Sequence, residues 1–208
     1  TIGDNLPNIV YVLDHNVQTS KVFRTIADAY AQIHILPYLN FKTQIGIDDS
    51  QTEGFQYQNP VHGDGRSSNG YIYNDFRNQM RWNFQNILSF DKTFASDHNV
   101  SAVLVSEVQS QTVNNFWGSG TNLSNDFFRY NLISGSYGVQ GSGGGLSENG
   151  FVSYAGRLNY NFKGKYFIQG SLRYDGISSL PPDNRYGLFP GASVGWTISK
   201  ESFMSSLN

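Results

Sequence analysis

Residues 154–198 alternate between apolar and polar side chains, and this pattern constrains the fold more than any other feature of the sequence. Within residues 154–162 every second residue is apolar, aromatic or glycine, and the residues between them are mostly polar. A period of two residues is typical of a β-strand whose two faces have different surroundings. Residues 163–165 form a turn signal, and the pattern restarts in 166–176, which predicts a β-hairpin. Residues 186–198 repeat it once more, so three adjacent strands are predicted.

The same alternation recurs earlier in the chain, which predicts about seven strands in all. Their predicted ranges are roughly 20–35, 39–48, 79–90, 100–111, 151–162, 166–176 and 186–198. Residues 49–78 and 112–150 are rich in Gly, Asn and aromatic residues, and we expect them to be long loops. Both fall at one end of the predicted sheet, with the tight turns at the other end. Long loops at one end and short turns at the other are typical of outer-membrane β-barrels, whose long loops are extracellular.

Composition excludes several classes of protein. Charged residues make up only 14% of the 208 residues, compared with roughly 25% in soluble domains. The net charge of -2 gives no basic footprint for a nucleic acid. The absence of Cys excludes disulfides and thiolate metal sites. No stretch approaches the roughly 20 apolar residues of a membrane-spanning helix, which excludes a helical membrane protein.

The distribution of aromatic residues favours a transmembrane β-barrel over a soluble sheet. Aromatic side chains lie near the ends of the apolar rows, and Gly and Ala lie in their middles, as expected for two membrane interfaces. Strands of about 9 to 11 residues also suit a tilted membrane crossing. The fold class predicted is therefore all-β, an antiparallel transmembrane barrel. The predicted lipid-facing residues are Tyr154, Leu158, Tyr160, Phe162, Ile168, Leu172, Tyr174, Val194 and Trp196.

A soluble secreted β-sandwich that binds glycans remains an alternative, because its strands also alternate. If the chain is a barrel, seven strands leave two unpaired edges, which lipid does not tolerate. We therefore expect residues 1–208 to be part of one larger barrel domain. The sequence begins at Thr1 without an initiator Met or export signal and stops at Asn208 shortly after a strand, so an internal piece of a longer polypeptide is expected.

Five motifs carry a family resemblance. They are Gly156–Tyr160, Gly164–Tyr166, Ser171–Gly176, Gly187–Trp196 and Ile198–Met204. In this order they resemble the barrel of SusC/RagA-type TonB-dependent transporters of Bacteroidetes. One small departure is Gly191, where the family often has Ser. The resemblance covers most of residues 20–204 and does not include the two predicted long loops.

The resemblance implies a 22-stranded barrel in the bacterial outer membrane, filled by an N-terminal plug domain. It also implies import of glycan or peptide fragments with a SusD-like surface lipoprotein as a lid and energy from TonB. The motifs of the plug and of a TonB-contacting segment are not among these 208 residues. A purely structural barrel, such as an adhesin anchor, is a third interpretation.

No catalytic, cofactor or metal site is predicted, and an enzyme is not expected. The four His residues are scattered without metal-ligand spacing. The adjacent Asp48 and Asp49 are interpreted as a loop start. The glycine run 141–145 lacks the Lys-Ser/Thr of a phosphate-binding loop and is interpreted as a loop tip.

Two sets of residues are candidates for contact with a substrate. The polar face predicts a lumen with charged residues that either brace the wall across strands or line the substrate path. These substrate-path candidates are Arg157, Arg173, Asp175, Arg81 and Glu107. Aromatic residues in the predicted loops can stack on sugars or peptide side chains, contact a lid, or pack the loops together. They are Tyr71, Tyr73, Phe116, Trp117, Phe127 and Phe128.

Overall fold

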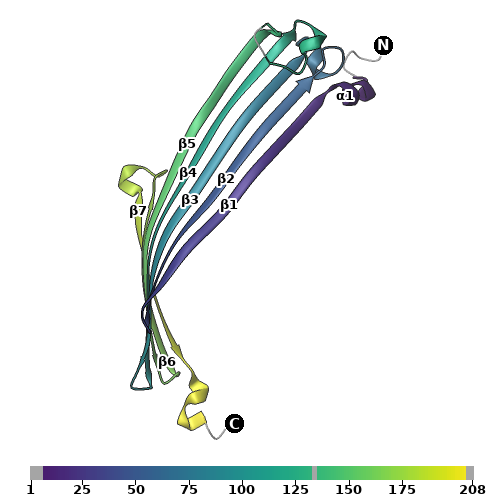
Figure 1. Ribbon diagram of the computed structural model, residues 1–208. Helices are drawn as coiled ribbons and strands as arrows, with labels where there is room; N and C mark the ends of the chain where they lie inside the picture. Colours follow the sequence, from purple (N-terminus) through teal and green to yellow (C-terminus); the bar gives the residue numbers. More distant parts are fainter. Residues whose placement is uncertain (1–6, 133–134, 205–208) are drawn as a thin grey trace. The chain divides into compact units, whose positions relative to one another are not determined.

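A single open sheet of seven antiparallel strands makes up most of the computed structural model (Figure 1). The structure describes residues 7–132 and 135–204, so Thr1 and Asn208 lie outside the described part. Each strand pairs with the next along the chain, in the order β1 to β7. The strands are β1 (Val17–Leu36), β2 (Leu39–Gln58), β3 (Tyr71–Phe94), β4 (His98–Leu123), β5 (Tyr137–Phe162), β6 (Tyr166–Ile177) and β7 (Tyr186–Trp196). The predicted all-β fold class is confirmed.

Helical structure in the described residues is limited to short segments. The α-helix α1 (Ile9–His15) was not predicted; it is capped by Asn8, whose side-chain oxygen accepts from the Tyr11 N–H at 3.2 Å. Five 3₁₀ segments follow: η1 (Asp64–Arg66), η2 (Asp126–Phe128), η3 (Pro182–Asn184), η4 (Ile198–Lys200) and η5 (Ser202–Met204). None of the helices in the described ranges has the length and apolar character needed to cross a membrane.

Four strands extend far into the segments predicted as long loops, which corrects that prediction. β2 continues to Gln58 and β3 begins at Tyr71, so the connection left between them is residues 59–70. Likewise β4 continues to Leu123 and β5 begins at Tyr137. The pairing of strands uses backbone groups, which every residue except Pro supplies. A strand that carries polar, aromatic or glycine residues on both faces therefore gives no alternating apolar signal.

The chain divides into two compact units. The first comprises Thr1–Thr25, Asp48–Met80 and Thr112–Glu148. Its buried cluster consists of Ile72, Leu123 and Tyr137, with Phe55 and Leu132 packed against it. The connection after β4 is held onto this cluster because the Tyr137 hydroxyl donates to the Arg129 carbonyl at 2.6 Å.

The second unit comprises Ile26–Ile47, Arg81–Gln111 and Asn149–Asn208, so it contains β6, β7 and the part of β5 that has the clearest alternation. A tight turn joins β5 to β6: Lys163 and Gly164 both have positive φ, at 54° and 60°, and the Lys165 N–H donates to the Phe162 carbonyl at 2.9 Å. Two central residues with positive φ define a type I′ turn, whose twist matches that of paired strands. The predicted hairpin is therefore confirmed.

Candidate functional site

The register of β5, β6 and β7 places the predicted apolar rows on one face of the second unit. Tyr154 lies opposite Tyr174, Leu158 opposite Gly170, and Tyr160 opposite Ile168. Across the next pair, Ile168 lies opposite Val194, and Tyr166 lies opposite Trp196. Since residues directly opposite each other point to the same face, the predicted lipid-facing residues on these strands share one surface.

This apolar surface is exposed in the described structure. Val194 is 85% exposed, Ile168 57% and Leu158 55%. Contiguous exposed apolar area of this kind marks a surface that contacts protein or lipid. Rings stack at one end of the rows, where the centroids of Phe162 and Tyr166 are 6.3 Å apart.

Charged residues occupy the opposite face of the same strands. Arg173 Nε donates to both carboxylate oxygens of Asp175, at 2.7 and 2.8 Å, so this pair forms along one strand and not across two. Glu107 lies on β4, the strand next to β5. Arg157 and Arg173 together line a concavity of about 370 Å³. Arg81 is separate from this group and donates to Gln111 Oε1 at 2.9 Å.

Three of the predicted aromatic contacts form a row of nearly parallel rings in the first unit. Tyr71 and Tyr73 are two residues apart on β3 and therefore point to the same face. Their ring centroids are 6.5 Å apart with an interplanar angle of 12°. The Trp117 ring continues the row at 5.9 Å from Tyr73, with an angle of 26°. We call Tyr71, Tyr73 and Trp117 the aromatic row.

The aromatic row depends on glycines in the neighbouring strand. A Cβ atom on Gly143 would lie 2.7 to 2.9 Å from atoms of the Trp117 indole, so the ring lies against the bare backbone of β5. The glycine run 141–145 is therefore part of a strand and not a loop tip, which corrects that interpretation. Within this run, Gly143 leaves room for the Trp117 indole, because any side chain at that position would displace the ring.

A carboxylate lies on the same face as the aromatic row. Asp75 is two residues beyond Tyr73 on β3, and its carboxylate occupies the space next to Gly54. Flat rings beside a hydrogen-bond acceptor can stack on the apolar face of a sugar or a peptide side chain and accept from its donors. The aromatic row and the Asp75 carboxylate together provide both of these contacts.

The other three predicted aromatic residues are not part of the row. Phe116 points to the face opposite Trp117, because adjacent residues in a strand alternate, and it packs on Phe76 with centroids 5.5 Å apart. Phe127 and Phe128 lie in η2 and contact each other edge to face at 5.0 Å. Of the six candidates, only these last two lie outside a strand, so the prediction of loop positions was wrong for the other four.

Two polar arrangements were not identified from the sequence. Arg24 on β1 forms a bidentate ion pair with Asp48 on β2, with both donor–acceptor distances at 2.7 Å. The register that pairs them joins residues 24 positions apart in the chain, so no local motif indicates this contact. This pair braces two strands.

The second arrangement is centred on Glu201, which follows β7. Its carboxylate accepts from the Tyr166 hydroxyl at 2.6 Å, from Trp196 Nε1 at 3.0 Å and from Lys165 Nζ at 3.2 Å. The bonds from Tyr166 and Trp196 lower the pKa of Glu201. The segment after β7 is thereby held to the turn between β5 and β6. Because the partners come from two distant parts of the chain, no local motif indicates this contact.

Comparison with known proteins gives relatives of one kind. No family model matches the chain. TonB-dependent receptor P3 of Formosa agariphila is 28% identical over 100% of this chain and 21% of its own length. TonB-dependent receptor P39 of the same organism is 27% identical over 92% of the chain and 18% of its own length. TonB-dependent receptor SusC of Bacteroides thetaiotaomicron is 42% identical over 30% of the chain and 6% of its own length.

Solved structures with the same fold also match this chain. The RagAB peptide transporter superposes with a TM-score of 0.80 at 19% identity, over 90% of this chain and 21% of the matched chain. The open-open state of the RagAB peptide importer gives the same TM-score over 92% of this chain. The chain spans about a fifth of the length of the first of these relatives and of the matched structures.

Proposed function

We propose that this chain is a wall segment of a SusC-like outer-membrane importer. The chain is related in sequence to TonB-dependent receptors, SusC among them, and it has the fold of part of a RagA-type barrel. The resemblance predicted from the five motifs is confirmed by these relatives. The observation that carries the proposal is the register of β5 to β7, which puts an exposed apolar surface on one face and charged residues on the other. A membrane on one side and a lumen on the other account for both faces.

The apolar surface has the dimensions of a membrane crossing. On β5 the aromatic positions Tyr154 and Phe162 are eight residues apart, which at about 3.4 Å per residue is about 27 Å along the strand. A strand tilted by about 40° then spans about 21 Å of membrane, close to the apolar band of about 25 Å in outer-membrane barrels. We propose that this surface contacts outer-membrane lipid and that the chain is part of a multi-pass barrel.

The alternatives explain the structure less well. A β-sandwich would cover the apolar surface with a second sheet, whereas the described residues form one sheet. A structural barrel without transport would agree with the fold, but the relatives are receptors, and the matched structures are of the RagAB peptide transporter and of the RagAB peptide importer. We infer transport, and no catalytic role, for the protein to which this segment belongs.

The proposed partners follow from the same relatives. We propose that the remainder of the barrel and its plug close the wall, that TonB energises import through a segment outside these residues, and that a SusD-like lipoprotein covers the outer end. The substrate proposed is a glycan or peptide fragment. The charged face, with Arg157, Arg173, Asp175, Arg81 and Glu107, is proposed to line its path, and the aromatic row is proposed to contact it.

Spin labels on neighbouring residues test the two faces. This segment contains no Cys, so single Cys variants at Ile168 and Gln169 in an otherwise Cys-free full-length protein can be labelled selectively. In lipid vesicles, the label at position 168 is expected to be accessible to oxygen and the label at 169 to a water-soluble nickel complex. Equal accessibility of the two positions would overturn the assignment of lipid and lumen.

A further inference from the structure

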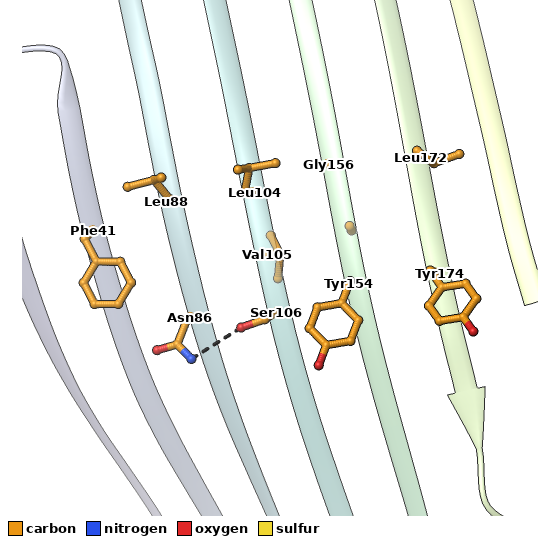
Figure 2. A pocket seen from close by; sticks show the side chains of 11 residues that line it. Phe41, Asn86, Leu88, Leu104, Val105, Ser106, Tyr154, Gly156, Leu172 and Tyr174 are labelled. Carbon is orange, nitrogen blue, oxygen red and sulfur yellow. Dashed lines mark hydrogen bonds between the residues drawn. The ribbon is translucent and has the colours of Figure 1, made fainter. Parts of the chain in front are cut away.

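The first half of β5 has a long edge that β6 does not cover. β6 pairs with β5 from Phe151, which lies opposite Ile177, to Phe162. Figure 2 shows β6 ending just beyond Tyr174, whereas β5 continues beside it. Since β6 is the strand that follows β5 in the sheet, residues 137–150 have β4 as their one neighbouring strand within the described part of the chain.

Gly150 identifies the backbone groups that point to the uncovered side. Its N–H donates to Ser178 Oγ at 2.6 Å, and its carbonyl accepts from the Ser178 N–H at 2.9 Å, so both groups point to the side on which β6 follows. Along a strand, the backbone groups of successive residues point alternately to the two sides. The N–H and carbonyl groups that share the side of Gly150 include those of Ser142, Gly144, Leu146 and Glu148. We call residues 142–148 the free edge.

The free edge lacks the features that usually prevent a sheet edge from binding another strand. Such edges are commonly short, or carry Lys, Pro or a bulge. Residues 142–148 include no Lys, Arg or Pro, and their one charged residue is Glu148 at the end. All of them except Gly143 are exposed. At about 3.4 Å per residue the free edge is about 20 Å long, and its four outward residues present four N–H and four carbonyl groups, eight in all.

The free edge adjoins the aromatic row. The Trp117 indole extends from β4 across to Gly143, where a Cβ would lie 2.7 to 2.9 Å from the ring. On this face of β5, Gly143 and Gly145 have no side chains that would obstruct those of an added strand. An added residue next to Gly143 can therefore pack against the indole whether its side chain is small or large.

We propose that the free edge binds a peptide substrate as an added β-strand. Main-chain hydrogen bonds supply the affinity in this mode of recognition, and the side chains of the bound peptide contribute selectivity where they meet a pocket or a ring. A glycan has no regular series of N–H and carbonyl groups, so the proposal narrows the imported substrate to a peptide. Contact with the aromatic row favours a substrate over a strand of a partner protein. The proposal rests on the proposed function, because it takes the aromatic row to be part of the substrate site.

The test measures binding of an end-capped, fluorescein-labelled peptide of nine residues, without charged residues or Pro, to the full-length protein by fluorescence anisotropy. The double variant Ser142→Pro, Leu146→Pro removes two N–H groups from the free edge and leaves the pairing with β4, because Pro is tolerated where the N–H side of an edge strand faces solvent. We expect it to weaken binding about tenfold, as for two net hydrogen bonds. Ser142→Ala, Leu146→Ala is the matched control. It loses the same side chains but keeps both N–H groups, and it is expected to bind within about twofold of the unaltered protein.

A modified peptide tests the same contact on the unaltered protein, so the result does not depend on folding of the Pro variant. N-methylation of the three central amides removes backbone donors and keeps every side chain, and we expect it to weaken binding at least about tenfold. Equal binding of the methylated peptide, or equal losses in the Pro and Ala variants, would overturn the proposal. Displacement of the peptide by maltohexaose would overturn the assignment to a peptide. Normal peptide binding by the Pro variant together with loss of a copurifying lipoprotein would replace the substrate with a partner strand.

The spin-label experiment separates failure of this proposal from failure of the proposed function. If the labels at positions 168 and 169 report lipid and lumen while the Pro variant binds the peptide normally, only the free-edge proposal fails.

Discussion

Leu158→Arg is the most discriminating perturbation of the proposed membrane surface. Leu158 is four residues from Tyr154 and four from Phe162 on β5, so it is about 14 Å along the strand from each aromatic end. It is therefore at the middle of the proposed crossing. Tyr174 on β6 is on the same surface but belongs to an aromatic end, since it lies opposite Tyr154.

The magnitude follows from this depth. An Arg at the midplane of a transmembrane barrel costs about 2 to 4 kcal/mol, and near the interface about 0 to 1 kcal/mol. We expect the midplane cost for Leu158→Arg and the interface cost for Tyr174→Arg. Leu172→Arg is expected to cost an intermediate amount, because Leu172 is two residues from Tyr174. In a soluble sheet, Leu158 would be a surface residue that is 55% exposed, and such a substitution would change stability by about 0.5 kcal/mol or less.

The assay is guanidinium unfolding of the full-length protein folded into phospholipid vesicles, followed by tryptophan fluorescence. Gln169→Arg is the control, because Gln169 lies opposite Asn159 on the polar face of the same hairpin. We expect it to cost less than about 1 kcal/mol. The reasoning is refuted if Gln169→Arg costs as much as Leu158→Arg, or if the cost does not fall from Leu158 to Tyr174.

Two further predictions concern the aromatic row and Glu201. Trp117→Ala is expected to weaken binding of an oligosaccharide or peptide substrate to the full-length protein by about 1 to 2 kcal/mol in calorimetry. Phe116→Ala, on the opposite face, is expected to leave the binding free energy unchanged. Equal losses in the two variants would contradict the proposal that the aromatic row contacts the substrate. Because the folded-state pKa of Glu201 is lowered, its stabilisation is present above the unfolded pKa of about 4.3 and is lost as pH falls through the folded value. Glu201→Gln should therefore reduce the acid dependence of thermal stability below about pH 4.3, and an unchanged dependence would contradict this role.

The sequence predicted the hairpin of β5 and β6 in detail because two independent signals agreed there. The period-two alternation assigned the faces, and Gly164 supplied a residue that readily accepts positive φ at the turn. Once the turn is fixed, every opposite pair in the hairpin follows, Tyr154 with Tyr174 included. The apolar surface was therefore predictable from local sequence alone.

The aromatic row was not predictable as a row, although its three members were identified. Tyr71 and Tyr73 lie in a segment without apolar alternation, so the strand that aligns them gave no signal. The contact of Trp117 with Gly143 depends on the register between β4 and β5, which joins residues far apart in the chain. The glycine run indicated a loop tip for the same reason, because glycine is typical both of loops and of strands against which a large ring packs.

Gly143 and Gly156, both on β5, show how one residue type serves two purposes in this strand. At Gly143 the missing side chain is replaced by the Trp117 indole, so the space is already filled from within the protein. At Gly156 the nearest side chain is Leu104 at 3.2 Å, and a groove of about 530 Å³ remains. A groove of that volume on a surface in contact with lipid would be occupied by lipid, because leaving it empty forfeits the dispersion contacts of its lining.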